Sequence, residues 1–169
     1  MRIPVFVSSP TALNPQQSAS RKLIFDQLEQ QALEPRALGQ FDYPTELPLR
    51  EVFLIAKRCS GGIILGFEQF YATGGTWKRG CGLGTERKTR KPTPFPTSWN
   101  QLEAGILFGL RLPLLVFREE GIKGGIFDEG VSDVFIHPMP TDPLTKASME
   151  GLAAVFRKWG AVVRNHYYG

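Results

Sequence analysis

The chain has 169 residues, 42% of them hydrophobic and 21% charged, a balance typical of one soluble globular domain spanning residues 1–169. No apolar run approaches the roughly 18 residues that a membrane span needs, and the N-terminus lacks the features of a signal peptide, so we expect a cytoplasmic protein. Two cysteines and two histidines at unsuitable spacings argue against a disulfide framework and predict no metal site.

The first 67 residues alternate between strand-like and helical patterns. An apolar, β-branched run ends at Ser8-Ser9-Pro10, and Asn14-Pro15 is a typical helix start. Glu34-Pro35 is expected to break the helix that follows. In chain order, the predicted elements are a strand at 3–7, a helix at 16–33, a strand at 36–39, a helix at 48–59 and a buried strand at 62–67.

Residues 68–96 show no sustained period and predict a long loop, with a short hairpin around 71–77. This segment supplies most of the net charge of +4, because it contains six basic residues and a single acidic residue, Glu86, between residues 78 and 91. They are Lys78, Arg79, Arg87, Lys88, Arg90 and Lys91. Such a cluster attracts phosphates, and the alternative is a solvated loop with excess charge.

The remaining predicted elements are a helix from Ser98, a strand at 112–117, a glycine-rich loop at 119–130, a strand at 134–136 and a helix at 144–163. The element order predicts an α/β fold. We expect a flavodoxin-like, doubly wound and mostly parallel five-stranded sheet with helices on both faces, carrying a basic loop insertion at about 68–97.

In this fold, the polar residues that follow the predicted strands meet at one edge of the sheet, where open α/β folds bind ligands. Glu103 faces the same edge from the early turns of the helix that begins at Ser98, and it is the candidate catalytic carboxylate. The other candidate ligand contacts are Ser8, Ser9, Pro10, Phe67, Glu68, Thr97, Ser98, Trp99 and Asn100. Weaker candidates for phosphate contact are Lys78, Arg79, Arg87 and Lys88.

Three segments resemble the superfamily that joins nucleoside 2-deoxyribosyltransferases with TIR domains. They are Val5 to Pro10, Cys59 to Gly66, and Trp99 to Gly105 with the strand that follows. Transferases carry an aspartate six residues before the glutamate, where this chain has Thr97, and this difference favours the TIR-like alternative.

The resemblance implies an enzyme that cleaves or transfers at the N-glycosidic bond of a nucleotide or nucleoside, with Glu103 stabilising or trapping the cationic sugar. A TIR-like NAD hydrolase or cyclase in antiphage defence is preferred to deoxyribosyl transfer. The resemblance implies no cofactor, with NAD as a substrate, and a homo-oligomer. The alternatives are a non-catalytic nucleotide sensor with the same pocket, and nucleic-acid binding through 78–91 with Trp77 available for stacking. A membrane partner is not expected.

Overall fold

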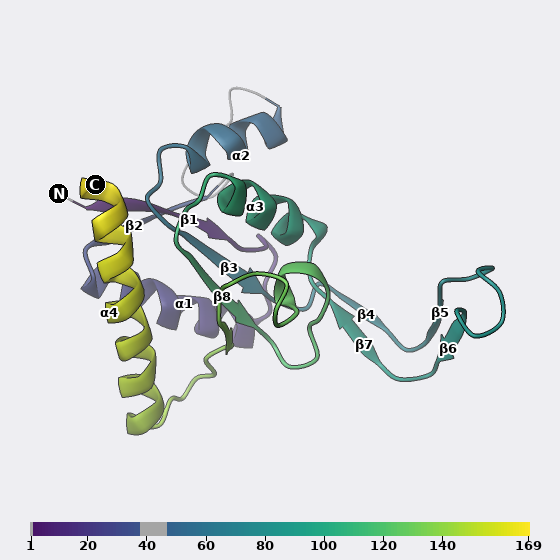
Figure 1. The fold of residues 1–169 in the computed structure, drawn as a ribbon. Helices are drawn as coiled ribbons and strands as arrows, with labels where there is room; N and C mark the ends of the chain where they lie inside the picture. Colours follow the sequence, from purple (N-terminus) through teal and green to yellow (C-terminus); the bar gives the residue numbers. More distant parts are fainter. Residues whose placement is uncertain (1, 38–46) are drawn as a thin grey trace.

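The computed structural model describes residues 2–37 and 47–169, and its centre is a five-stranded parallel sheet (Figure 1). The strands are β1 (Ile3–Ser8), β2 (Leu33–Arg36), β3 (Gly62–Gly66), β8 (Leu114–Arg118) and β9 (Ile136–Pro138). Their order is β2-β1-β3-β8-β9, and every neighbouring pair is parallel. The predicted flavodoxin-like, doubly wound fold is confirmed.

Two helices cover each face of this sheet (Figure 1). Successive side chains of a strand point to opposite faces of the sheet. Val5 and Val7 of β1 therefore pack on the face covered by α1 (Pro15–Gln30) and α4 (Lys146–Tyr168). Phe6 packs on the other face, which α2 (Pro48–Ala56) and α3 (Ser98–Gly109) cover. No helix in the described part of the chain combines the length and apolar character that a membrane span requires.

The helices on either side of the ligand-binding edge have well-defined starts. Asn14 caps α1 as predicted, because its side chain accepts from the amide of Gln17, and the Gln17 side chain accepts from the amide of Asn14. Thr97 caps α3 by accepting from the amide of Trp99. Asn100 is therefore not needed as a cap, and its side chain is fully buried.

Strand β2 differs from the prediction, which ended the preceding helix at residue 33. Helix α1 ends at Gln30, Ala32 has a positive φ of 55°, and β2 begins at Leu33 and runs through Pro35. Proline is tolerated there because β2 is an edge strand. The end of the strand predicted at 36–39, and the loop around Tyr43, lie outside the described residues.

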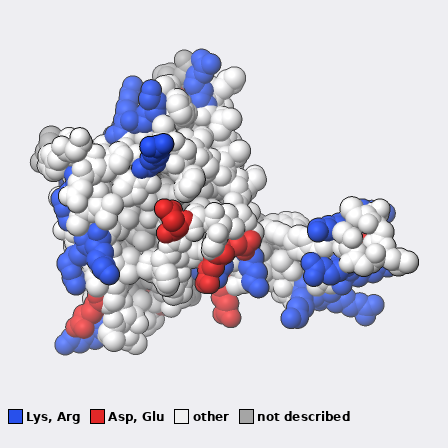
Figure 2. All heavy atoms as spheres, viewed as in Figure 1, with Lys and Arg blue, Asp and Glu red and all other residues white. Residues whose placement is uncertain are grey.

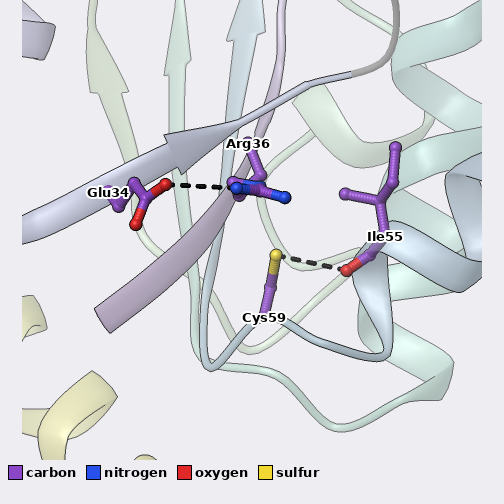
Figure 3. A network of polar contacts seen from close by, with 4 residues as sticks. All are labelled: Glu34, Arg36, Ile55 and Cys59. Atoms are coloured by element: carbon purple, nitrogen blue, oxygen red, sulfur yellow. Dashed lines mark hydrogen bonds and ion pairs between the residues drawn. The ribbon is translucent and has the colours of Figure 1, made fainter. Parts of the chain in front are cut away.

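A small polar network borders the end of β2 (Figure 3). Arg36 forms an ion pair with Glu34 at 3.1 Å. Nearby, the thiol of Cys59 donates to the carbonyl oxygen of Ile55 at 3.3 Å, across the end of α2. Cys59 is buried and is not part of a disulfide.

Several predicted boundaries shift by a few residues. Helix α2 ends at Ala56 rather than 59, and β8 begins at Leu114 rather than 112. The strand predicted at 134–136 is β9, Ile136–Pro138, which pairs only with β8 and leaves Phe135 73% exposed. Helix α4 starts later than 144 because Thr145 caps it, accepting from the amide of Ser148.

The predicted long loop is instead an antiparallel arm, residues 70–95, that projects from the body (Figure 1). Near the body, β4 (Phe70–Ala72) pairs with β7 (Thr93–Phe95), and further out β5 (Gly75–Trp77) pairs with β6 (Arg87–Thr89). Three-residue strands are too short to display the alternation that identifies strands from sequence. The loop prediction is therefore wrong for the twelve residues that the four strands occupy. The hairpin predicted at 71–77 is also wrong, because β4 and β5 in this range do not pair with each other but with β7 and β6.

We expect the fold to survive without the outer arm, because no arm residue belongs to the buried hydrophobic core. Replacing residues 74–91 by Asn-Gly, a favoured hairpin turn, should change the free energy of unfolding by less than about 0.5 kcal/mol. Urea denaturation of the two proteins checks this expectation. A clear fall in the unfolding midpoint would mean that the arm packs against the body.

Candidate functional site

The candidate site lies at the carboxyl edge of the sheet, between β1 and β3. In the strand order observed here, this is the point where the chain switches from one side of the sheet to the other, and flavodoxin-like folds bind ligands there. Ser8 ends β1 and Gly66 ends β3. Both residues belong to the side-chain register that faces α3, together with Phe6 and Ile64.

A chain of hydrogen bonds links β1 to α3 at this edge. The amide nitrogen Nδ2 of Asn100 donates to the hydroxyl oxygen of Ser8 at 2.7 Å. The same hydroxyl hydrogen-bonds to the carboxyl group of Glu103. Ser8 and Asn100 are fully buried and Glu103 is 9% exposed, so three polar side chains are held together in a largely apolar setting.

The ionisation of Glu103 reflects this setting. Burial raises the pKa of Glu103 to about 7, because the charged carboxylate loses its hydration, and the hydrogen bond from Ser8 opposes part of that rise. At neutral pH the group is therefore present in both forms. It can donate a hydrogen bond when protonated and accept one when ionised.

Asn100 has one polar atom that the protein leaves unsatisfied. Its Nδ2 is used by Ser8, but its Oδ1 is buried and has no hydrogen-bond partner among the described residues. An unsatisfied buried acceptor costs about 1–3 kcal/mol. A ligand or water that brings an N–H or O–H group to this oxygen would recover that cost.

A separate cleft of about 820 Å³ lies beside α1 at the same edge of the sheet. Glu68 and Glu119 line it, and the carboxylate of Glu119 accepts from the amide of Glu68 at 2.6 Å and from the side chain of Gln17 at 3.1 Å. Neither Glu119 nor Gln17 was predicted from the sequence as a site residue. The Asn14-x-x-Gln17 capping pattern is the sequence signal that could have identified Gln17.

Gln101 fixes the glycine-rich loop against α3. Its Nε2 donates to the carbonyl of Gly124, and its Oε1 accepts from the amide of Ile126, both at 3.0 Å. The amide of Gly124 donates to Asp128. The amides of Gly124 and Ile126 therefore already have partners within the protein. Nothing in the sequence singled out Gln101 as the residue that holds this loop.

The predicted ligand contacts are only partly brought together. Phe67 is fully buried within the core that includes α1 and α4, and Thr97 is the cap of α3. Ser9 donates to the carbonyl of Pro10 in the loop that follows β1. Ser98 starts α3, and Trp99 beside it is 38% exposed. These residues remain predicted contacts. Of the predicted site residues, Ser8, Asn100 and Glu103 are the three that the structure connects by hydrogen bonds.

The basic residues predicted to bind phosphate lie elsewhere. Lys78 and Arg79 follow β5, and Arg87 and Lys88 belong to β6, at the outer end of the arm (Figure 1). The structure therefore separates them from Ser8 and the sheet edge. Among the described residues, no group of three or more histidine, cysteine, aspartate or glutamate side chains is placed to hold a metal ion.

Two solved structures share this fold. The metal-soaked Flv1 flavodiiron core from Synechocystis sp. PCC6803 is 10% identical, with a TM-score of 0.51; the match covers 98% of this chain but only 36% of that one. The diflavin flavoprotein A3 from Nostoc sp. is 13% identical, with a TM-score of 0.50, covering 99% of this chain and 96% of that one. No protein-family model and no curated protein matches the sequence.

These comparisons overturn the assignment to the deoxyribosyltransferase and TIR superfamily. Both similar structures are flavodiiron or diflavin proteins, so N-glycosidic cleavage or transfer, a role in antiphage defence, NAD as the substrate and the absence of a cofactor are all wrong. A strand that ends in serine and a helix with an early glutamate arise wherever this fold places polar groups at its ligand edge, so these short motifs do not separate families. Self-association, nucleic-acid binding and the absence of a membrane partner stay predictions.

Proposed function

We propose that this chain is a flavodoxin-like ligand-binding domain, and that its site between β1 and β3 holds a flat heteroaromatic ring of the flavin class. The observation that carries the proposal is the buried, unpartnered Oδ1 of Asn100 at the position where this fold binds its ligands. The fold shared with a diflavin flavoprotein supports the choice of ring.

The polar groups at this edge suit the ring of a flavin. A flavin ring has an N–H group and carbonyl oxygens on one edge, so it offers a donor to the Oδ1 of Asn100 and acceptors to the protonated carboxyl of Glu103. Trp99, exposed at the start of α3, offers an aromatic face beside them. When bound, a flavin would supply electron-transfer chemistry. The chain's own groups would bind and orient the ring.

The phosphate of flavin mononucleotide suits the site less well. Phosphates bind the first turn of a helix through its free amides, but α1 has Pro15 at its first position and Asn14 occupies the amide of Gln17. The carboxylate of Glu119 also contacts Gln17 and would repel a phosphate placed there. We therefore expect riboflavin, which has no phosphate, to bind at least as tightly as flavin mononucleotide.

Titration of each flavin with the purified protein, followed by quenching of flavin fluorescence, tests the proposal. We expect riboflavin to bind with a dissociation constant of about 1–10 μM, the range of a ligand of this size. Asn100→Leu keeps the branched shape of the side chain but removes Oδ1, together with the donor to Ser8, and should weaken binding about tenfold, since a hydrogen bond is worth about 1–1.5 kcal/mol.

The matched control is Asn165→Leu, which makes the same change on the exposed surface of α4 and should leave binding unchanged. Circular dichroism confirms that both variants are folded. The proposal fails if neither flavin binds, or if Asn100→Leu and Asn165→Leu bind riboflavin equally well. Much tighter binding of flavin mononucleotide than of riboflavin would overturn the argument from Glu119.

A further inference from the structure

The arm, residues 70–95, has no role in the site proposed above and is the most unusual feature of the molecule. It is a two-stranded antiparallel ribbon that extends away from the sheet (Figure 1). Its aromatic residues contact one another: the ring of Phe95 lies 6.3 Å from that of Phe70 and 6.0 Å from that of Trp77, measured between centroids. These contacts connect the inner and outer strand pairs.

The arm also carries the positive charge of the protein. Six of the 20 basic residues, but only one of the 16 acidic ones, lie between residues 70 and 95. The body is therefore left with 14 basic and 15 acidic residues. Figure 2 shows the basic side chains gathered over the arm on the right, whereas charges of both signs are scattered over the body.

These six side chains are available to a partner. All of them are exposed, and within the described residues none forms an ion pair. The arm's one acid, Glu86, is occupied in the tip, where its carboxylate accepts from the amide of Gly80 at 2.7 Å. So many unpaired like charges repel one another, and a polyanion bound along the arm would relieve that repulsion.

The shape of the arm narrows the choice of polyanion. The major groove of B-form DNA admits a two-stranded β-ribbon, whereas the major groove of duplex RNA is too deep and narrow for side chains to read. Neighbouring residues of a strand point to opposite faces, so Arg87 and Lys88 of β6 lie on opposite faces of the ribbon. A ribbon with basic side chains on both faces can reach phosphates on both walls of a groove.

We propose that the arm binds duplex DNA, with its basic side chains contacting the phosphates that border the major groove. The body then serves as a platform that presents the arm. Most of the affinity comes from phosphate neutralisation, so binding is largely independent of base sequence and strongly dependent on salt.

Fluorescence anisotropy of a labelled duplex of about 20 base pairs, two helical turns, tests the proposal with the full chain. Between about 50 and 200 mM salt, we expect affinity to fall roughly 10²- to 10³-fold if four to six phosphates are contacted. The variant Arg87→Ala/Lys88→Ala/Arg90→Ala should bind at least tenfold more weakly at the lower salt concentration, with a salt slope smaller by about 3.

The control Lys146→Ala/Arg157→Ala/Lys158→Ala removes the same charge from exposed positions of α4, on the body. We expect it to keep the affinity and salt slope of the parent protein. An equal loss in both triple variants would overturn the proposal, because it would indicate attraction to the whole protein rather than to the arm. Circular dichroism verifies that each variant folds.

Two further probes separate DNA from other polyanions. Competition with duplex RNA of the same length should be at least tenfold less effective, and vesicles with about one-third phosphatidylserine, an anionic lipid, should not displace the DNA. Preferential binding to RNA or to vesicles would overturn the proposal. Failure to bind duplex DNA at protein concentrations up to about 100 μM, the weak limit of non-specific binding, would do the same.

Discussion

Replacing Glu103 by glutamine should make the protein more stable at pH 8 than the parent by about 3 kcal/mol, while the two have nearly equal stability at pH 4.5. Burial raises the pKa of Glu103 from 4.5 to about 7. Glutamine has the same shape and can still accept from the Ser8 hydroxyl, but it has no charge to bury.

The direction of this effect follows from proton binding. Between pH 4.5 and about 7 the folded protein retains a proton on Glu103 that the unfolded chain has released. The stability that this proton provides is fully present below pH 4.5, falls as the pH rises, and is lost once the pH has passed about 7. In the glutamine variant this loss does not occur, so the two stability curves diverge with increasing pH.

Urea denaturation of both proteins at several pH values between 4.5 and 8 measures the divergence. Groups other than Glu103 titrate in both proteins and cancel in the difference. Glu150→Gln, at an exposed position of α4, is the matched control and should not reproduce this divergence. A constant difference between Glu103→Gln and the parent would mean that Glu103 is solvated in the folded protein.

Keeping a carboxyl group at this position is therefore costly for stability, and the cost points to a role in binding. Natural proteins retain buried ionisable groups and unsatisfied polar atoms most often at functional sites. Asn100 and Glu103 lie about one helical turn apart on α3, and both hydrogen-bond to the hydroxyl of Ser8, while the Oδ1 of Asn100 is left without a partner among the described residues. The buried carboxyl group of Glu103 and the unpartnered Oδ1 of Asn100 each lower the stability of the folded protein. Their occurrence at one place favours a ligand-binding role over a structural role for either residue alone.

The sequence predicted the parts of the fold that have strong local patterns. Buried parallel strands are continuous apolar runs, and Asn14-Pro15 marks a helix start, so β3 and α1 could be located and the order of the elements identified the fold class. The edge strands were harder. Pro35 ends a helix in most contexts, and only its position in an edge strand makes it compatible with β2.

The site was predicted less completely than the fold. The position of Glu103 near the ligand edge followed from the expected topology. Its hydrogen-bonded neighbour Ser8 is distant in sequence, so local patterns could not reveal this contact. Family assignment failed for a different reason. Short motifs at a sheet edge report the architecture, and many unrelated activities use that architecture.

Replacing Phe127 by alanine should destabilise the protein by about 3–5 kcal/mol, the usual cost of removing a buried phenylalanine ring. Phe127 is fully buried at the end of the short 3-10 helix η1 (Gly125–Phe127), and its ring lies over Gly66 at the end of β3. Its carbonyl also accepts from Arg118. Urea denaturation gives the loss, and Phe135→Ala, at a residue 73% exposed, should cost less than about 0.5 kcal/mol.

The close approach of Phe127 to Gly66 supplies a sharper test. A methyl group added at Gly66 would lie 2.5 Å from the ring of Phe127, so Gly66→Ala should cost about 1–3 kcal/mol because the ring must move. In the Phe127→Ala background the same methyl group enters space that the ring has left, and the cost should largely disappear. The double-mutant cycle should therefore give a coupling energy of about 1–3 kcal/mol. Additive losses would show that Gly66 and Phe127 are not in contact, and that η1 does not close over the end of β3 beside the candidate site.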